Sequence, residues 1–323
     1  MLLHAPLTQE HIDYLRKKGI LHPDESVRSS RKAGEGNMNV TLAVSTEKRT
    51  IILKQSRPYV AKYPEVPAPS ERTGIEYSFY QYMATQPEVA HYSPRVFAFD
   101  RDSWLLALEF VEKGVDYLCI YHHPDQFTEA LGDDLLRYLK GLHQVTAQTF
   151  PENRAMRTLN HQHIFLLPFQ ENNGFDLNGI QPGLEQLSLK IKTNGDLIGK
   201  VRQLGKRYLS PGSKLIHGDF YPGSWLSSPG GLKIIDTEFA FVGDPEFDLG
   251  VMLAHLYLAR VPDVRIKDLR ERYPLNEALL AAFTGTEILR RLFGLAQLPL
   301  VLSLEEKEKL ANQAIQLILH EAF

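Results

Sequence analysis

The sequence has one cysteine, Cys119, among 323 residues. A single thiol excludes an intramolecular disulfide, and with it the stapled framework of small secreted domains. The chain has no apolar run approaching the roughly 18 residues that cross a bilayer, and its first residues do not have the basic start and apolar core of a secretory signal. We therefore expect a soluble, cytoplasmic protein without a membrane partner.

The charges show no basic excess. The chain has 36 Lys and Arg residues and 39 Asp and Glu residues, which gives a net charge of -3. Proteins that bind nucleic acid concentrate positive charge, so nucleic acid is not an expected partner, whereas a charged metabolite is compatible with this balance. The length suits one large or two modest domains with substantial cores, and it leaves the formation of a homodimer open.

The first third of the sequence has mainly the patterns of β-strands. The apolar run 51–53, which contains two β-branched isoleucines, is typical of a strand, and the glycine-bearing segment before it is typical of a turn that leads into its hairpin partner. Thr8 is a suitable helix N-cap, and Gly19 a suitable stop. The segment 34–44 is predicted as a glycine turn followed by a strand. Further strands are predicted at 49–54 and 104–111, and helices at 8–18 and 71–83.

The remainder of the sequence is mostly helical in pattern. Four prolines within 57–70 predict an ordered loop, because proline donates no backbone hydrogen bond and is excluded from helix interiors. A break at 112–114 is the candidate boundary between an N-terminal lobe, 1–111, and a C-terminal lobe, 112–323. Beyond it, Leu131, Leu135, Leu139 and Leu142 recur at helical spacing, which predicts a helix with one face in the core.

Two acidic motifs carry the strongest chemical signal. Asp219 follows a short apolar strand, where its carboxylate could accept the proton of an attacking hydroxyl. Asp236 and Glu238 follow the next apolar strand, 232–235, and offer hard oxygen ligands of the kind that Mg²⁺ prefers. Their spacing of two would place both carboxylates on one side of an extended segment. The alternative is a set of buried carboxylates at strand ends, satisfied by backbone N–H groups.

The glycine turn could contribute to the same chemistry. Gly34 and Gly36 bracket one residue, and backbone N–H groups in such a turn can approach a phosphate closely. Lys54 on the next strand and Glu76 on the following helix are the residue types that hold nucleotide phosphates in kinases. An ordinary hairpin turn, an exposed lysine and a solvated glutamate are the structural alternative.

These motifs, in this order, resemble the aminoglycoside phosphotransferase and choline kinase superfamily, which has the protein-kinase-like fold. Within it the chain looks most like the methylthioribose kinases, and the likeness covers nearly the whole sequence. The segments that carry the narrower likeness are Gly34–Asn39, Lys54–Val60, His217–Ser224, Asp236–Phe241 and Gly285–Ala296, which contains a pair of arginines.

The resemblance implies a role for each matching residue. Asp219 would be the catalytic base, Asp236 and Glu238 would bind Mg²⁺, and Arg290 and Arg291 would bind the phosphoacceptor. ATP would lie between the two lobes, with its phosphates organised by Lys54 and Glu76. The remaining nucleotide-binding positions would be Gly34, Gly36, Asn37 and Asn39 over the phosphates, and Glu109, Phe110 and Val111 at the adenine.

The sequence also departs from the family pattern. Ser224 stands where most of the superfamily has an asparagine that binds magnesium, but serine is also found there in the methylthioribose kinase type and does not imply a loss of activity. The chain is shorter than typical methylthioribose kinases between Leu249 and Leu280. Residue pattern alone puts Arg290 and Arg291 outside the apolar stripe of their helix, where they would face either a cleft or water.

We therefore expect a two-lobed α+β kinase fold, with a small antiparallel-sheet lobe and a larger helical lobe. The expected reaction is transfer of the γ-phosphoryl group of ATP, with Mg²⁺, to a hydroxyl of methylthioribose or a related sugar. Two alternatives stay open, namely a kinase for a choline-like amino alcohol, an aminoglycoside or another metabolite, and a catalytically silent nucleotide-binding module.

Overall fold

The computed structural model describes residues 1–34 and 38–323, and the chain folds into two compact units. The first unit comprises Met1–Val115, Thr149–Met156 and Ser227–Ala240, and the second comprises Asp116–Gln148, Arg157–Leu226 and Phe241–Phe323. The segment that carries Asp236 and Glu238 therefore belongs to the same unit as the N-terminal strands. The functional lobes 1–111 and 112–323 stay a prediction from the sequence.

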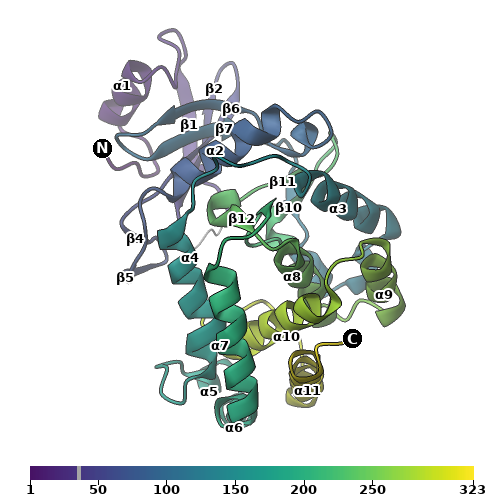
Figure 1. Cartoon of the computed structure of the whole chain (residues 1–323). Coiled ribbons are helices and arrows are strands. Elements are labelled where there is room, and N and C mark those ends of the chain that lie inside the picture. Colours follow the sequence, from purple (N-terminus) through teal and green to yellow (C-terminus); the bar gives the residue numbers. More distant parts are fainter. Residues whose placement is uncertain (35–37) are drawn as a thin grey trace. The chain divides into compact units, whose positions relative to one another are not determined.

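A five-stranded antiparallel sheet forms the framework of the first unit (Figure 1). Its central strand β3 pairs with β2 through Leu42 and Leu53, and with β7 through Lys54 and Leu106. The apolar run at 51–53, with its two β-branched isoleucines, suits this half-buried, pleated position. In sheet order the strands are β1 (Val27–Lys32), β2 (Val40–Thr46), β3 (Thr50–Gln55), β7 (Leu105–Glu109) and β6 (Val96–Asp100).

The helices of this unit complete its core. Leu15 from α1 (Gln9–Lys17) packs with Val44, Leu53 and Ala107 of the sheet in one buried cluster. Thr8 caps α1 in a capping box with His11, which confirms the predicted start of that helix. Helix α2 (Arg72–Ala84) contacts β6 and β7. The segment 57–70, predicted as a loop, contains a small hairpin of β4 (Tyr59–Val60) and β5 (Tyr63–Pro67).

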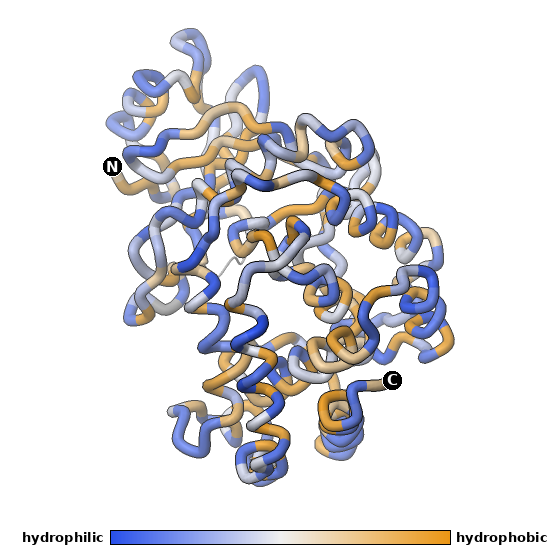
Figure 2. Tube along the Cα trace, in the orientation of Figure 1, coloured by the Kyte–Doolittle hydropathy of each residue, from blue (hydrophilic) through white to orange (hydrophobic). Residues whose placement is uncertain are grey.

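The second unit is mainly helical, and α10 is its central element. Helix α10 packs against α8 and α11, and Gly285 allows its close approach to α11, since a Cβ there would lie 2.5 Å from the carbonyl oxygen of Ala314. Figure 2 shows hydrophobic and hydrophilic residues alternating along α7, as expected for a helix with one face in a core. The helices are α3 (Glu129–Leu142), α4 (Arg154–His161), α5 (Leu177–Ile180), α6 (Leu184–Lys192), α7 (Gly195–Leu209), α8 (Pro245–Leu258), α9 (Asp263–Arg272), α10 (Glu277–Phe293) and α11 (Leu304–His320).

Short elements connect these parts. Strand β9 pairs antiparallel with β12, and the two strands lead into the loop after Ile216 and into the helix α8 respectively. The short strands are β8 (Val115–Asp116), β9 (Lys214–Ile216), β10 (Trp225–Ser227), β11 (Lys233–Ile234) and β12 (Phe241–Gly243). Single helical turns are η1 (Ala90–Tyr92), η2 (Leu118–Tyr121), η3 (Pro124–Gln126), η4 (Gln162–Leu166), η5 (Leu167–Phe169), η6 (Pro222–Ser224) and η7 (Thr237–Phe239).

The antiparallel sheet near the N-terminus and the helical remainder confirm the predicted α+β class. Leu131, Leu135, Leu139 and Leu142 are all buried on α3, as their spacing predicted. Within residues 1–34 and 38–323, we find no helix with the length and apolar character that a bilayer crossing requires.

Candidate active site

The loop that carries Asp219 is fixed by a buried carboxylate from another element. It leaves β9 after Ile216, and Gly218 adopts a φ of 83°, a conformation that glycine takes without strain. Asp248 on α8 accepts hydrogen bonds from the backbone N–H groups of His217 (2.7 Å) and Gly218 (2.9 Å). Ser224 donates its hydroxyl hydrogen bond to the Asp219 carbonyl oxygen at 3.1 Å, so it closes the same loop.

Asp219 presents its carboxylate to two arginines of α10. Its Oδ1 lies 3.2 Å from Arg291 Nη2 and 3.9 Å from Arg290 Nη1, and the side chain stays 20% exposed. Burial raises the pKa of Asp219 above the ordinary range, and the two arginines only partly oppose this shift. The group is therefore a better proton acceptor than an exposed aspartate.

Both arginines are held by Glu287, one turn earlier on α10. Arg290 Nη1 lies 2.9 Å from Glu287 Oε2, and Arg291 Nε donates to Oε1 at 2.6 Å. Burial acts to raise the pKa of Glu287, but the two guanidinium groups outweigh it and hold that pKa well below its usual range. Arg290 and Arg291 are only 7% and 5% exposed, so they are buried ion-pair residues, and of the two positions left open by the residue pattern, a cleft or water, water is wrong.

A neutral histidine extends this network. His255 Nε2 lies 3.2 Å from Glu287 Oε1, and its Nδ1 lies 2.5 Å from the hydroxyl of Tyr121. Burial lowers the pKa of His255 to about 4, so the ring is uncharged at neutral pH. A carboxylate can only accept hydrogen bonds, which assigns the ring proton to Nε2 and makes Tyr121 the donor to Nδ1.

The first unit holds a second charged cluster, centred on Lys54. The ammonium group lies 2.7 Å from Glu76 Oε2 and 2.5 Å from Asp236 Oδ1. Burial opposes the charged form of Lys54, but the carboxylates outweigh it and raise the lysine pKa. Burial, partly offset by Lys54, raises the pKa of Glu76 to about 7. The predicted pairing of a strand lysine with a helix glutamate is thus present.

Glu238 belongs to the same part of the unit and is anchored separately. Its Oε2 accepts a hydrogen bond of 2.6 Å from Asn39 Nδ2 and lies 3.5 Å from Nε of the fully buried Arg72. Arg72 Nε in turn donates to Asn39 Oδ1 at 2.8 Å. Asn39 therefore bridges Arg72 and Glu238. Burial raises the pKa of Glu238.

The segment with the two acidic residues is not extended. Asp236 has left-handed backbone angles, φ 63° and ψ 46°, and the single helical turn η7 follows it at once. The expectation of an extended segment is therefore wrong, because a turn replaces the strand after β11. The turn leaves the Asp236 side chain 48% exposed and buries that of Glu238.

The other predicted nucleotide residues lie outside this cluster of contacts. Gly34 has a φ of 71°, as a glycine turn requires, while Gly36 and Asn37 lie outside the described residues. Glu109 ends β7, and its side chain accepts a hydrogen bond of 3.0 Å from the Arg95 backbone N–H. Phe110 and Val111 follow it, half-buried.

Several residues that shape these clusters were missed by sequence reasoning. The pairing of Glu287 with the arginines could have been predicted from the sequence, because Glu287 precedes them by three and four residues on a predicted helix. Arg72 and Asp248 had none, because each acts on a segment remote in sequence.

The fold and the two charged clusters together indicate a class of proteins, the phosphotransferases with a protein-kinase-like fold. Comparisons with solved structures agree with this class. The structure of a spectinomycin phosphotransferase in complex with ADP and spectinomycin aligns with a TM-score of 0.55 at 15% identity, over 98% of this chain and 99% of that one. A choline kinase from Streptococcus pneumoniae aligns with a TM-score of 0.52 at 15% identity, over 95% and 99%. These likenesses show the fold.

Sequence comparison identifies the family. A family model described as the phosphotransferase enzyme family matches residues 30–277, so the chain belongs to that family. The methylthioribose kinase of Exiguobacterium sibiricum is 30% identical over 276 residues, which are 81% of this chain and 69% of the relative. Methylthioribose kinase 1 of Oryza sativa subsp. japonica is 25% identical over 71% of this chain and 56% of the relative. The resemblance stated from the motifs is confirmed, although the chain spans only part of these relatives.

The Glu287 network generates a stability prediction. Glu287→Gln keeps the shape of the side chain but leaves two buried guanidinium groups without their shared counter-charge, so we expect a loss of roughly 3 to 5 kcal/mol in the free energy of unfolding. Urea denaturation followed by circular dichroism measures it. The control is Glu305→Gln, which removes an exposed carboxylate paired with Lys309 and should change little. Equal effects of the two substitutions would contradict the role assigned to Glu287.

Proposed function

We propose that this protein transfers the γ-phosphoryl group of ATP to a hydroxyl of methylthioribose or a related sugar. The observation that carries the proposal is the Asp219 carboxylate, held 3.2 Å from Arg291 on a loop fixed by Asp248. A carboxylate with a raised pKa suits the role of a base toward a hydroxyl, and nearby guanidinium groups suit the charge that spreads over phosphoryl oxygens during transfer. The similarity to methylthioribose kinases supports the choice of acceptor.

The cluster around Lys54 suits the nucleotide. Lys54, fixed by Glu76, would hold the ATP phosphates, with Gly34, Gly36, Asn37 and Asn39 near them and Glu109 to Val111 at the adenine. The likeness to a phosphotransferase complex with ADP supports this use of the fold.

The same cluster fits a magnesium ion. Lys54 and Arg72 face three carboxylates, those of Glu76, Asp236 and Glu238, so the cluster has one negative charge in excess when all three are ionised. Asp236 and Glu238 would hold the ion with their carboxylate oxygens, the donors that Mg²⁺ prefers, and the exposed side of Asp236 leaves room for water and phosphate. When bound, the ion would neutralise part of the phosphate charge.

Asp219 would accept the proton of the acceptor hydroxyl as that oxygen attacks. Arg290 and Arg291 would orient the sugar and stabilise the transferring group, and Glu287 fixes both before substrate arrives. The similarity to methylthioribose kinases favours a sugar as the acceptor over a choline-like amino alcohol or an aminoglycoside. The joint presence of Lys54, Asp219 and Asp236 argues against a silent nucleotide-binding module.

Removing the base gives the first test of the chemistry. Asp219→Asn should lower kcat by on the order of 100-fold or more, with little change in the Kd for ATP, because a positioned general base is lost. Steady-state kinetics and nucleotide titration measure the two quantities. In the wild type the base must be deprotonated, so kcat/KM should fall as pH drops through the raised pKa of Asp219. Arg291→Met should move this acidic limb to higher pH, and near-normal turnover of Asp219→Asn would remove Asp219 from its role.

The metal assignment is tested by substitutions that keep side-chain shape. Asp236→Asn should abolish the dependence of nucleotide binding on magnesium, and Glu238→Gln should weaken it, since each removes one anionic ligand. Titration of a fluorescent ATP analogue at several magnesium concentrations, with melting curves to monitor folding, gives the answer. An unaltered magnesium dependence in folded Glu238→Gln would make Glu238 a partner of Arg72 and Asn39 alone.

The acceptor is tested directly. With ATP and magnesium, the protein should phosphorylate methylthioribose on its anomeric hydroxyl and leave choline and aminoglycosides unchanged, as measured by mass spectrometry of the products. Phosphorylation of choline or an aminoglycoside, with methylthioribose unchanged, would contradict the proposed acceptor but support the proposed kinase activity.

A further inference from the structure

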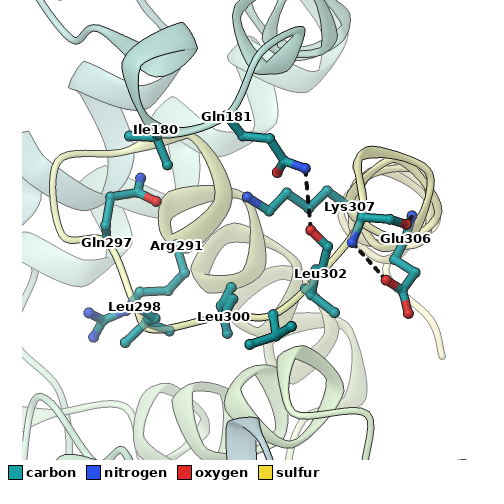
Figure 3. Close-up of a pocket in the computed structure, with 11 residues that line it drawn as sticks. Ile180, Gln181, Arg291, Gln297, Leu298, Leu300, Leu302, Glu306 and Lys307 are labelled. Carbon is teal, nitrogen blue, oxygen red and sulfur yellow. Dashed lines mark hydrogen bonds between the residues drawn. The ribbon is translucent and has the colours of Figure 1, made fainter.

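The second unit contains a cavity of about 560 Å³ beside α10 (Figure 3). It lies among the end of α5, the side chain of Arg291, the segment 297–303 and the first turn of α11. Apolar side chains form much of its wall, namely Ile180, Leu298, Leu300, Val301 and Leu302. A wall of this kind suits the carbon skeleton of a small molecule.

One cation lines this cavity without a counter-charge. Lys307 is 6% exposed, and no hydrogen bond or ion pair engages its ammonium group among the residues that the structure describes. Figure 3 shows its side chain extending from α11 across the pocket, with the nitrogen on the side of Gln181. The contrast with Lys309 is direct, because that lysine is exposed on the same helix and pairs with Glu305 at 2.7 Å.

The position of Lys307 makes its charge costly. It occupies the buried stripe of α11 together with Ala311, Ala314 and Ile318, where an apolar residue would normally pack. Burial lowers the pKa of Lys307. An unpaired buried ammonium destabilises a fold, and such groups persist where a ligand supplies the missing partner.

The other polar groups of the cavity suit a hydroxylated anion. Gln181 Oε1 is buried and has no hydrogen-bond partner in the described part of the chain, while its Nε2 donates to the Leu302 carbonyl at 3.4 Å. Glu306 is the one carboxylate in the lining, and Arg260 and the Ser303 N–H already engage it. The lining thus offers cations and a free acceptor for a hydroxyl proton.

We propose that this cavity binds the non-reacting end of the phosphoacceptor and that Lys307 recognises an acidic group there, a carboxylate or a phosphate. Arg291 links the cavity to the base, because its side chain lines the cavity and its Nη2 lies 3.2 Å from Asp219 Oδ1. The inference rests on the proposed kinase function. Among methylthioribose and the related sugars, it favours as acceptor a sugar that carries an acidic group. It predicts that Lys307 is a specificity determinant and adds little to stability.

Calorimetric titration of the full chain without ATP, using ribose, riburonate (ribose oxidised to a carboxylate at C5) and ribose 5-phosphate as probes, tests the inference. At least one of the two acids should bind about 10- to 100-fold more tightly than ribose, the gain expected from a charge-assisted hydrogen bond. The tighter of the two identifies the acidic group as carboxylate or phosphate. Lys307→Met should abolish the preference, Lys307→Arg should retain part of it, and Lys309→Met should leave it unchanged.

Stability supplies an independent readout. Lys307→Met removes an unpaired buried charge, so its melting temperature should equal or exceed that of the wild type. A lower melting temperature would make Lys307 a structural residue and overturn the inference, as would equal affinity of all three probes. Efficient phosphorylation of methylthioribose with no effect of Lys307→Met would also overturn it while the proposed function stands. Acid binding that depends on Lys307, without any phosphoryl transfer, would support the cavity and reject the proposed function.

Discussion

The buried carboxylate of Glu287 is the interaction on which the candidate active site depends. Two guanidinium groups cannot be taken out of water side by side unless an anion sits between them, and Glu287 provides it at hydrogen-bond distance to both. His255 and Tyr121 then satisfy the rest of this carboxylate's surroundings without adding charge. Asp219 thereby meets arginines whose orientation is already fixed.

The first unit uses the same principle with the signs exchanged. Lys54 is a buried cation held by two carboxylates, and Arg72 is a buried cation bound to Asn39 and Glu238. In both units, charges that would be expensive alone become rigid when they are paired. This rigidity is what electrostatic catalysis requires, since groups that are already oriented need not reorganise during the reaction.

Sequence reasoning predicted the elements whose pattern is local. The cap at Thr8, the hairpin of β2 and β3 and the buried leucines of α3 each follow from spacing within a short window. The spacing of Asp236 and Glu238 predicted an extended backbone, which is wrong, because the left-handed turn at Asp236 depends on tertiary contacts and no glycine marks it. Residue spacing also left the position of Arg290 and Arg291 undecided between a cleft and water, because a charged residue beside an apolar stripe is usually solvated unless its buried partner is known.

Glu287 also constrains how this chain could diverge. One carboxylate serves two cations, and the helix geometry that joins them is set by separations of three and four residues on α10. A substitution at any one of the three positions leaves a buried charge without its partner inside the unit. Simultaneous replacement of all three residues by apolar residues of similar volume would leave no such charge. Across homologous sequences these positions should therefore be inherited as a block, with covariation among them stronger than with any neighbouring residue of the helix.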